Sequence, residues 1–329
     1  MSPLLPGQQS ADPARLAPAP AGAPGFPSRS PSLDVLPGFR NPPPGYGEVP
    51  FWWWTGDRLD KKRLLWQIEE LHRKGVTGMQ VNYAHEDTPG WPTYAADPEV
   101  FSEEWWEIWA WVVGECRKRG MGIGLSGYTL DWPGKDDLFS RLIYADPELN
   151  GAELTVLAKV DAAPGRPVRL AVSPDTIAVR AWKREGRALL PGGTDLLPDA
   201  RDGAIAWEPA VGTWQVWAIG ARRKPRTLNP MHPEAGKRVI ERFFQPCADR
   251  APGGTAEGLN YFFQDELQFG VGSRIWCADF AEQFRQSKGY DILDRLPALF
   301  EDIGPITPKV RLDYADVKVR LCEERYFRP

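Results

Sequence analysis

The chain has 329 residues, of which 42% are hydrophobic and 26% are charged, and its formal net charge is −4. This composition is typical of a globular protein with a sizeable core, and the charge gives no reason to expect a nucleic-acid partner. No apolar run reaches the length of a membrane span, and the N-terminus lacks the layout of a secretory signal, so the sequence predicts a cytoplasmic protein. The four cysteines form no C-x-x-C pair, which argues against a zinc site and a disulfide framework.

Residues 1–45 are rich in Pro, Ala, Gly and Ser and show almost no apolar periodicity. Because such a segment cannot bury enough apolar surface to form a core, we expect a disordered tail. In residues 46–150, apolar runs typical of strands alternate with segments of helical periodicity, which predicts the first part of a β/α barrel. The expected elements are strand 49–54, a helix from Asp57 or Asp60 to Lys74, strand 78–83, helix 102–119 and strand 122–127.

Residues 151–226 have a different pattern, with short strands separated by Gly, Pro and Asp, and they predict an inserted antiparallel β-domain. The strands expected there are 152–160, 167–173, 176–184 and 204–221. Residues 227–329 return to the earlier alternation and predict a continuation of the barrel. The elements expected in this last part are helix 233–244, strand 260–267, helix 276–288 and helix 309–326.

Strands and helices that alternate through short loops are typical of a parallel sheet or barrel. A (β/α)8 barrel needs eight strand–helix units, and outside the β-domain this chain supplies roughly half of them. We therefore expect an α/β fold. It is either an open sheet or a partial TIM-type barrel with an inserted β-domain, apparently truncated after its fourth strand.

The expected strand at 260–267 ends in two adjacent carboxylates, Asp265 and Glu266. A buried strand rarely ends on unpaired acids, because ionised groups are costly to desolvate. In a β/α barrel, however, the carboxyl ends of the strands carry the catalytic side chains. Asp265 and Glu266 point to opposite faces of an extended strand, so at most one of them points into a pocket if the strand is regular to its end. The alternative is that the pair caps the following loop or binds a metal.

Polar residues also follow the second expected strand, at the same mouth of the barrel. Asn82, His85 and Glu86 suit the recognition of sugar hydroxyls, because amide and imidazole groups donate and accept while a carboxylate accepts from two hydroxyls. The alternative is a solvated loop.

Aromatic residues follow the first and third expected strands. Trp132 is a candidate for stacking on a sugar ring, and Asp131 for binding a hydroxyl or serving as the second carboxylate. The alternative for both is a tight Trp-Pro-Gly turn. Trp54, the last residue of the run Trp52–Trp54, is the best candidate for the floor of the pocket, although one face of that run is expected to be core.

A succession of motifs resembles glycoside hydrolase family 106, the α-L-rhamnosidase family. The matching segments are Pro43–Gly56, Gly75–Val81, Gly127–Pro133 with Arg141–Tyr144, Leu228–Pro230 with Pro233–Ala235, and Phe263–Gly270 with Phe280–Tyr290. The resemblance covers most of residues 43–329. It implies a large β/α barrel that cleaves rhamnosides with inversion and is assisted by calcium.

The chain departs from this family at the end of its fourth strand. The family usually has the pattern Asp-Ser-x-Glu there; Asp265 matches its Asp, whereas Glu266 takes the Ser position and Gln268 the Glu position. We expect Glu266 to be the general acid and Gln268 to contact the substrate. The resemblance implies a glycosidase acting on a carbohydrate. The alternatives are a truncated, non-catalytic sugar-binding remnant, or a barrel lyase or isomerase that uses the same carboxylates.

Overall fold

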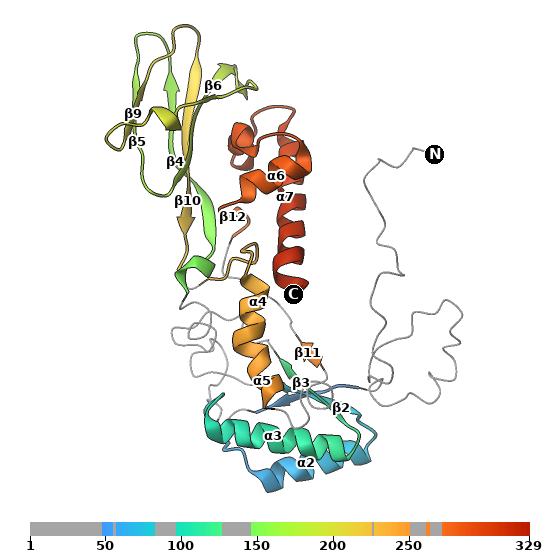
Figure 1. The fold of residues 1–329 in the computed structure, drawn as a ribbon. Helices are drawn as coiled ribbons and strands as arrows, with labels where there is room; N and C mark the ends of the chain where they lie inside the picture. Colours follow the sequence, from blue (N-terminus) through green and yellow to red (C-terminus); the bar gives the residue numbers. More distant parts are fainter. Residues whose placement is uncertain are drawn as a thin grey trace, which may run out of the picture. The chain divides into compact units, whose positions relative to one another are not determined.

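The computed structural model of the protein describes residues 48–54, 57–82, 97–126, 146–225, 227–250, 261–263 and 272–329. These residues belong to two compact units (Figure 1). Unit 1 takes its described residues from 48–126 and 248–263, and unit 2 takes them from 146–247 and 272–329. Within these ranges, no helix has both the length and the apolarity needed to cross a membrane.

Unit 1 contains a four-stranded parallel sheet with the strand order β1-β2-β3-β11. The strands are β1 (Phe51–Trp53), β2 (Gly78–Asn82), β3 (Gly122–Ser126) and β11 (Tyr261–Phe263). In the chain, helix α2 (Lys61–Arg73) lies between β1 and β2, and helix α3 (Glu103–Lys118) lies between β2 and β3. Unit 1 therefore has the strand–helix alternation that its sequence predicts, since parallel neighbours need such crossovers.

Both helices of unit 1 begin at a side-chain cap. The Asp60 carboxylate accepts a hydrogen bond of 2.9 Å from the backbone N–H of Arg63, and the Ser102 hydroxyl accepts one of 3.2 Å from that of Trp105. These bonds satisfy backbone donors that have no partner inside the helix. They fix the start of each helix, and thereby which side chains of α2 and α3 are buried.

One face of the parallel sheet is apolar and is covered by α3. The ring of Trp54 contacts the rings of Trp105 and Trp109 in this helix at centroid distances of 5.7 and 6.3 Å. Because side chains alternate along a strand, Trp52 lies on the same face, and Trp52 is level with Val81 of β2. The other buried residues that the register places on this face are Met79, Ile123 and Leu125.

The opposite face of this sheet carries amides, glycines and aromatic residues. Gln80 is level with Phe51 of β1 and with Gly124 of β3, and Trp53 is level with Asn82. Parallel strands that are buried on both faces are usually rich in branched apolar side chains. The composition of this face therefore marks the carboxyl end of β2 as a place to look for function.

Unit 2 contains a larger antiparallel sheet with the strand order β12-β4-β10-β6-β7, with β8 paired to β6, and a separate two-stranded ribbon of β5 and β9. The sheet strands are β4 (Ala152–Ala162), β6 (Thr176–Glu185), β7 (Ala188–Leu189), β8 (Thr194–Asp195), β10 (Trp214–Arg223) and β12 (Ile275–Trp276). The ribbon strands are β5 (Val168–Ala171) and β9 (Ala204–Trp207).

The single strand expected at 204–221 is in fact two strands with different partners. β9 pairs with β5, whereas β10 pairs with β4 and β6. The break follows Trp207 and contains Pro209, which has no N–H for a ladder, and Gly212, whose φ of +82° suits a turn. The apolar pattern of residues 204–221 is continuous, so it did not indicate that the chain passes from the two-stranded ribbon to the large sheet within this segment.

The helices of unit 2 mostly follow the expected positions. The segment expected as helix 233–244 consists of α4 (Ala235–Val239) and a π-helix (Ile240–Phe244), and α5 (Gln245–Asp249) comes next in the chain. Later come α6 (Phe280–Lys288), a 3-10 helix (Ile292–Leu299), α7 (Thr307–Cys322) and a terminal π-helix (Glu323–Phe327). Short 3-10 turns occupy Pro147–Leu149 and Leu197–Asp199.

Two apolar cores stabilise unit 2. In the first, Phe280 of α6 packs between Trp276 and Tyr314 at centroid distances of 4.8 and 5.1 Å, and Tyr314 donates a hydrogen bond to the carbonyl oxygen of Ile275. The second lies between the ribbon and the large sheet, and its buried residues include Val168, Leu170, Ile205, Val179 and Val216. The helices after β12 are thus anchored on the edge of the β-rich part.

Candidate functional site

Among the residues that the sequence singles out, Trp54 and Asn82 are described by the structure. The others lie outside the described residues: Asp265, Glu266, Gln268, His85, Glu86, Asp131 and Trp132. The roles predicted for them stay predictions.

Asn82 is the last residue of β2, and its side chain is completely buried. Its backbone carbonyl accepts a hydrogen bond of 2.8 Å from the backbone N–H of Trp54, so the structure brings these two predicted residues side by side. The Asn82 side chain is held by Gln80, whose Nε2 donates to Asn82 Oδ1 at 3.1 Å. Both amides belong to the sheet face opposite α3.

The amide nitrogen of Asn82 is a buried donor that has no hydrogen-bond acceptor within the described structure. A buried polar group left unpaired costs about 1–3 kcal/mol of stability. Native proteins seldom retain such a group without a reason. A ligand with an oxygen acceptor would satisfy the Asn82 amide, and this donor is therefore a candidate functional group among the described residues of unit 1.

Trp54 is placed in the core of unit 1. Its side chain is 1% exposed, and its ring is enclosed edge-on by Trp52, Trp105 and Trp109. Stacking on a sugar needs an exposed ring face, and the arrangement leaves none. The indole nitrogens of Trp54 and Trp105 are also buried without an acceptor in the described part of the chain.

Gln80 is a site residue that the sequence analysis did not single out. The signal for it was present, because Gly78, Gln80 and Asn82 alternate with Met79 and Val81 in a strand. Two amides at a spacing of two residues share one face of a strand, and an amide pair on a fully buried strand is unusual.

A small cavity lies at the start of α2, and its volume is about 90 Å³. Trp52 contributes one wall and donates from its indole nitrogen to Gln67 at 3.0 Å. Arg58 and Arg63 lie on its rim, and Arg63 pairs with Asp57 at 3.0 Å. Because ligand pockets usually measure about 300–1,000 Å³, this cavity is too small to hold a sugar by itself.

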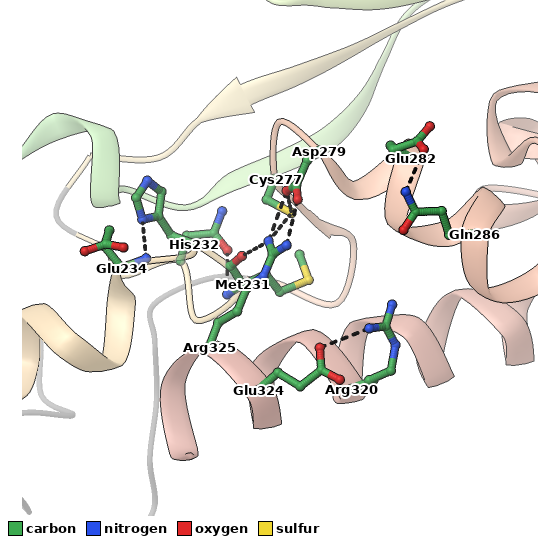
Figure 2. Close-up of polar contacts among 11 residues, drawn as sticks. Met231, His232, Glu234, Cys277, Asp279, Glu282, Gln286, Arg320, Glu324 and Arg325 are labelled. Atoms are coloured by element: carbon green, nitrogen blue, oxygen red, sulfur yellow. Dashed lines mark hydrogen bonds and ion pairs between the residues drawn. The ribbon is translucent and has the colours of Figure 1, made fainter. Parts of the chain in front are cut away.

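A polar cluster of unit 2 is centred on Arg325 (Figure 2). Its guanidinium donates to both carboxylate oxygens of Asp279, at 3.0 and 2.6 Å, and to the carbonyl of Met231 at 2.7 Å. The Cys277 thiol donates to Asp279 at 3.3 Å. The hydrogen bonds from Arg325 lower the pKa of Asp279 to about 2. The cluster ties the terminal π-helix to the start of α6, which is a structural role.

His232 lies at the border of this cluster, before α4 (Figure 2). Its Nδ1 accepts a hydrogen bond of 3.2 Å from the backbone N–H of Glu234. Burial lowers the pKa of His232, although the carboxylates of Glu148 and Glu234 oppose that shift. A neutral imidazole with its Nδ1 already engaged acts here as a cap for the following turn.

The calcium that the family resemblance implies finds no ligand set in the described residues. Within these ranges, no three side chains of His, Cys, Asp or Glu lie close enough to hold a metal ion. Calcium binds six to eight oxygen ligands, several of them carboxylates. Calcium therefore stays a prediction from the resemblance alone.

Comparisons with known proteins support the fold. No protein-family model and no curated protein matches the sequence. Among solved structures, a rhamnosidase from Novosphingobium sp. PP1Y is similar, with a TM-score of 0.65 and 13% sequence identity. The match covers 90% of this chain, and the chain spans 45% of the length of that rhamnosidase. The protein therefore has a mixed α/β, rhamnosidase-like fold.

Proposed function

We propose that this chain is part of a glycoside hydrolase resembling family 106 and that it binds a sugar at the carboxyl ends of β1, β2, β3 and β11. In this proposal the four parallel strands are strands one to four of a TIM-type barrel. Residues 46–150 and 227–329 contribute to the barrel, and 151–226 are an insertion. The substrate is a carbohydrate, and an α-L-rhamnoside is the first to test.

One observation carries the proposal: a fully buried amide, Asn82, ends a parallel strand with its nitrogen unpaired in the described structure. In β/α barrels, ligands bind at this end of the strands. A sugar offers many neutral oxygen acceptors, which is what an unpaired amide nitrogen needs. The similarity in fold to a rhamnosidase supports the same class of ligand.

The proposed chemistry follows from the carboxylates at 265 and 266. Glu266, protonated, donates its proton to the glycosidic oxygen as the bond to the anomeric carbon breaks. A second carboxylate activates a water that attacks the anomeric carbon from the opposite face, which inverts its configuration. Asp265 and Asp131 are candidates for that base, and His85, Glu86, Gln268 and Trp132 are candidates for contacts with the sugar.

The experiment is an assay of the purified chain with aryl glycosides, beginning with p-nitrophenyl α-L-rhamnoside. Glu266→Gln keeps the size of the side chain but removes its acidic proton, so we expect at least a hundredfold lower kcat. Aryl substrates with a good leaving group should lose less activity than substrates with a poor one. Full activity of Glu266→Gln towards both would overturn the assignment of the general acid.

Two other functions have distinct signatures in the same experiment. A sugar-binding remnant would bind L-rhamnose without turning over any aryl glycoside, and Asn82→Ala would weaken that binding. A barrel lyase would release an unsaturated sugar, and an isomerase would release no aglycone. Product analysis by mass spectrometry separates these outcomes, because hydrolysis alone adds one water.

A further inference from the structure

The hydrogen bond between Gln80 and Asn82 decides which atoms of Asn82 remain available. An asparagine amide can present either its oxygen or its nitrogen in a given direction, because the two orientations differ by a half-turn. Here Gln80 Nε2 donates to Asn82 Oδ1 at 3.1 Å, which engages the oxygen and leaves the nitrogen unpaired in the described structure. Both side chains are buried, at 2% and 0% exposure, so water does not compete for this bond.

The surroundings of the pair indicate the kind of group that the nitrogen receives. The register places Phe51, Trp53, Gly78 and Gly124 around Gln80 and Asn82 on this face, and none of these described residues is ionisable. The described residues on this face offer no cation to pair with an anion, whose burial would be costly. A neutral oxygen, such as a hydroxyl or a ring oxygen, fits the amide donor without that penalty.

A purely structural role does not explain the hydrogen-bonded pair of Gln80 and Asn82. Within a buried strand, two apolar residues of similar size would avoid the penalty of the unpaired nitrogen. A hydrogen bond between Gln80 and Asn82 does not remove that penalty, since it satisfies Asn82 at its oxygen only. What the bond does provide is a defined orientation of the remaining donor.

We propose that Gln80 is a positioning residue of the sugar site, which orients Asn82 so that its Nδ2 donates to a neutral oxygen of the ligand. The inference rests on the proposed function, because the ligand is the sugar of that proposal. Gln80 acts through Asn82 and does not itself touch the sugar.

The test uses the 329-residue chain with L-rhamnose as the probe and follows the side-chain amide signals of Asn82 by ¹⁵N NMR. In the wild type, titration with L-rhamnose should shift these signals. Gln80→Glu presents a carboxylate that accepts from Asn82, so the amide turns and its nitrogen becomes paired. Gln80→Met removes the bond altogether. We expect both variants to bind L-rhamnose about tenfold more weakly, as the loss of one oriented hydrogen bond predicts.

A matched control and a double variant separate positioning from general damage to the strand. Val81→Ala lies on the opposite face of the same strand, and it should lower stability while leaving the affinity for L-rhamnose unchanged. In an Asn82→Ala background, Gln80→Met should cause no further loss of affinity, because its effect passes through Asn82.

The outcomes distinguish this inference from the proposed function. Folded Gln80→Met and Gln80→Glu variants that bind as tightly as the wild type would overturn the positioning role. Additive losses of affinity for L-rhamnose in the double variant Gln80→Met/Asn82→Ala would also overturn the positioning role. If the wild-type signals do not respond to L-rhamnose or to p-nitrophenyl α-L-rhamnoside, the sugar site fails. In that case unchanged Asn82 signals in Gln80→Glu would refute the orienting bond as well.

Discussion

Gln80 and Asn82 lie two residues apart on one buried strand and are joined by a hydrogen bond of 3.1 Å between their side-chain amides. The bond leaves one buried nitrogen of Asn82 without a partner in the described structure. Such a pair lowers stability and defines an orientation, which is the pattern expected where function outweighs stability. Its consequences for stability are open to measurement without any ligand.

Replacing both amides by apolar residues should not destabilise the protein. In Gln80→Met/Asn82→Leu no unpaired amide remains, and we expect a free energy of unfolding equal to that of the wild type or up to about 3 kcal/mol higher. Asn82→Leu alone leaves the Nε2 donor of Gln80 without its acceptor. This single variant should therefore be less stable than the double variant. Urea unfolding measures all three proteins. A double variant less stable than the single one would contradict this account of the pair.

Trp54 should behave as a core residue. Trp54→Ala removes a ring that packs against Trp105 and Trp109, and we expect a loss of about 3–5 kcal/mol in the free energy of unfolding. Trp66 of α2, which is 61% exposed, provides the control, since Trp66→Ala should change the free energy by less than about 0.5 kcal/mol. Similar effects of the two substitutions would show that Trp54 is not enclosed.

The ion pair between Asp279 and Arg325 should make stability depend on pH in acid. The pKa of Asp279 is about 2 in the folded protein and has a reference value of 3.8, so the carboxylate is stabilised by folding. Its contribution is complete above the reference value and is lost as the pH falls through about 2. Asp279→Asn should therefore be less stable than the wild type at neutral pH, and the difference should shrink below about pH 4.

Glu282 of α6 is the control for this pH dependence. It pairs with Arg285 at the surface, where solvent screens the interaction. Glu282→Gln should therefore change the melting temperature little at any pH. A constant difference between Asp279→Asn and the wild type from pH 7 to pH 2 would show that the pair does not stabilise the fold through charge.

The four thiols should react slowly in the folded protein. Burial raises the pKa of Cys116 and Cys277 to about 12, raises that of Cys247 further, and raises that of half-buried Cys322 to about 11. Because the thiolate is the reactive form, 5,5′-dithiobis(2-nitrobenzoate) at pH 8 should modify Cys322 first and the others only after unfolding. Cys322→Ser should remove the fastest phase. A fast phase that persists in this variant would contradict the burial of the other thiols.

Local sequence signals predicted much of the fold. Helix starts at Asp60 and Ser102 are confirmed because a cap depends on residues only a few positions apart. The strand–helix alternation of unit 1 follows from periodicity, which is also a local property. The resemblance to rhamnosidases is confirmed at the level of the fold by the solved structure from Novosphingobium.

Partner choice and burial depended on contacts between distant parts of the chain. The division of residues 204–221 into β9 and β10 follows from pairing with β5 and β4, which lie far away in sequence. Trp54 directly follows the last residue of β1, and its enclosure by Trp105 and Trp109 depends on how α3 packs.

By itself, the sequence determined the order of the elements and placed Gln80 and Asn82 on one face of a strand, because side chains alternate with a period of two. Only the tertiary structure decided that both amides are buried, that one orients the other and that a donor is left over. Hydrogen-bond satisfaction depends on every group packed around an atom, and those groups come from neighbouring strands and helices as well as from the strand itself.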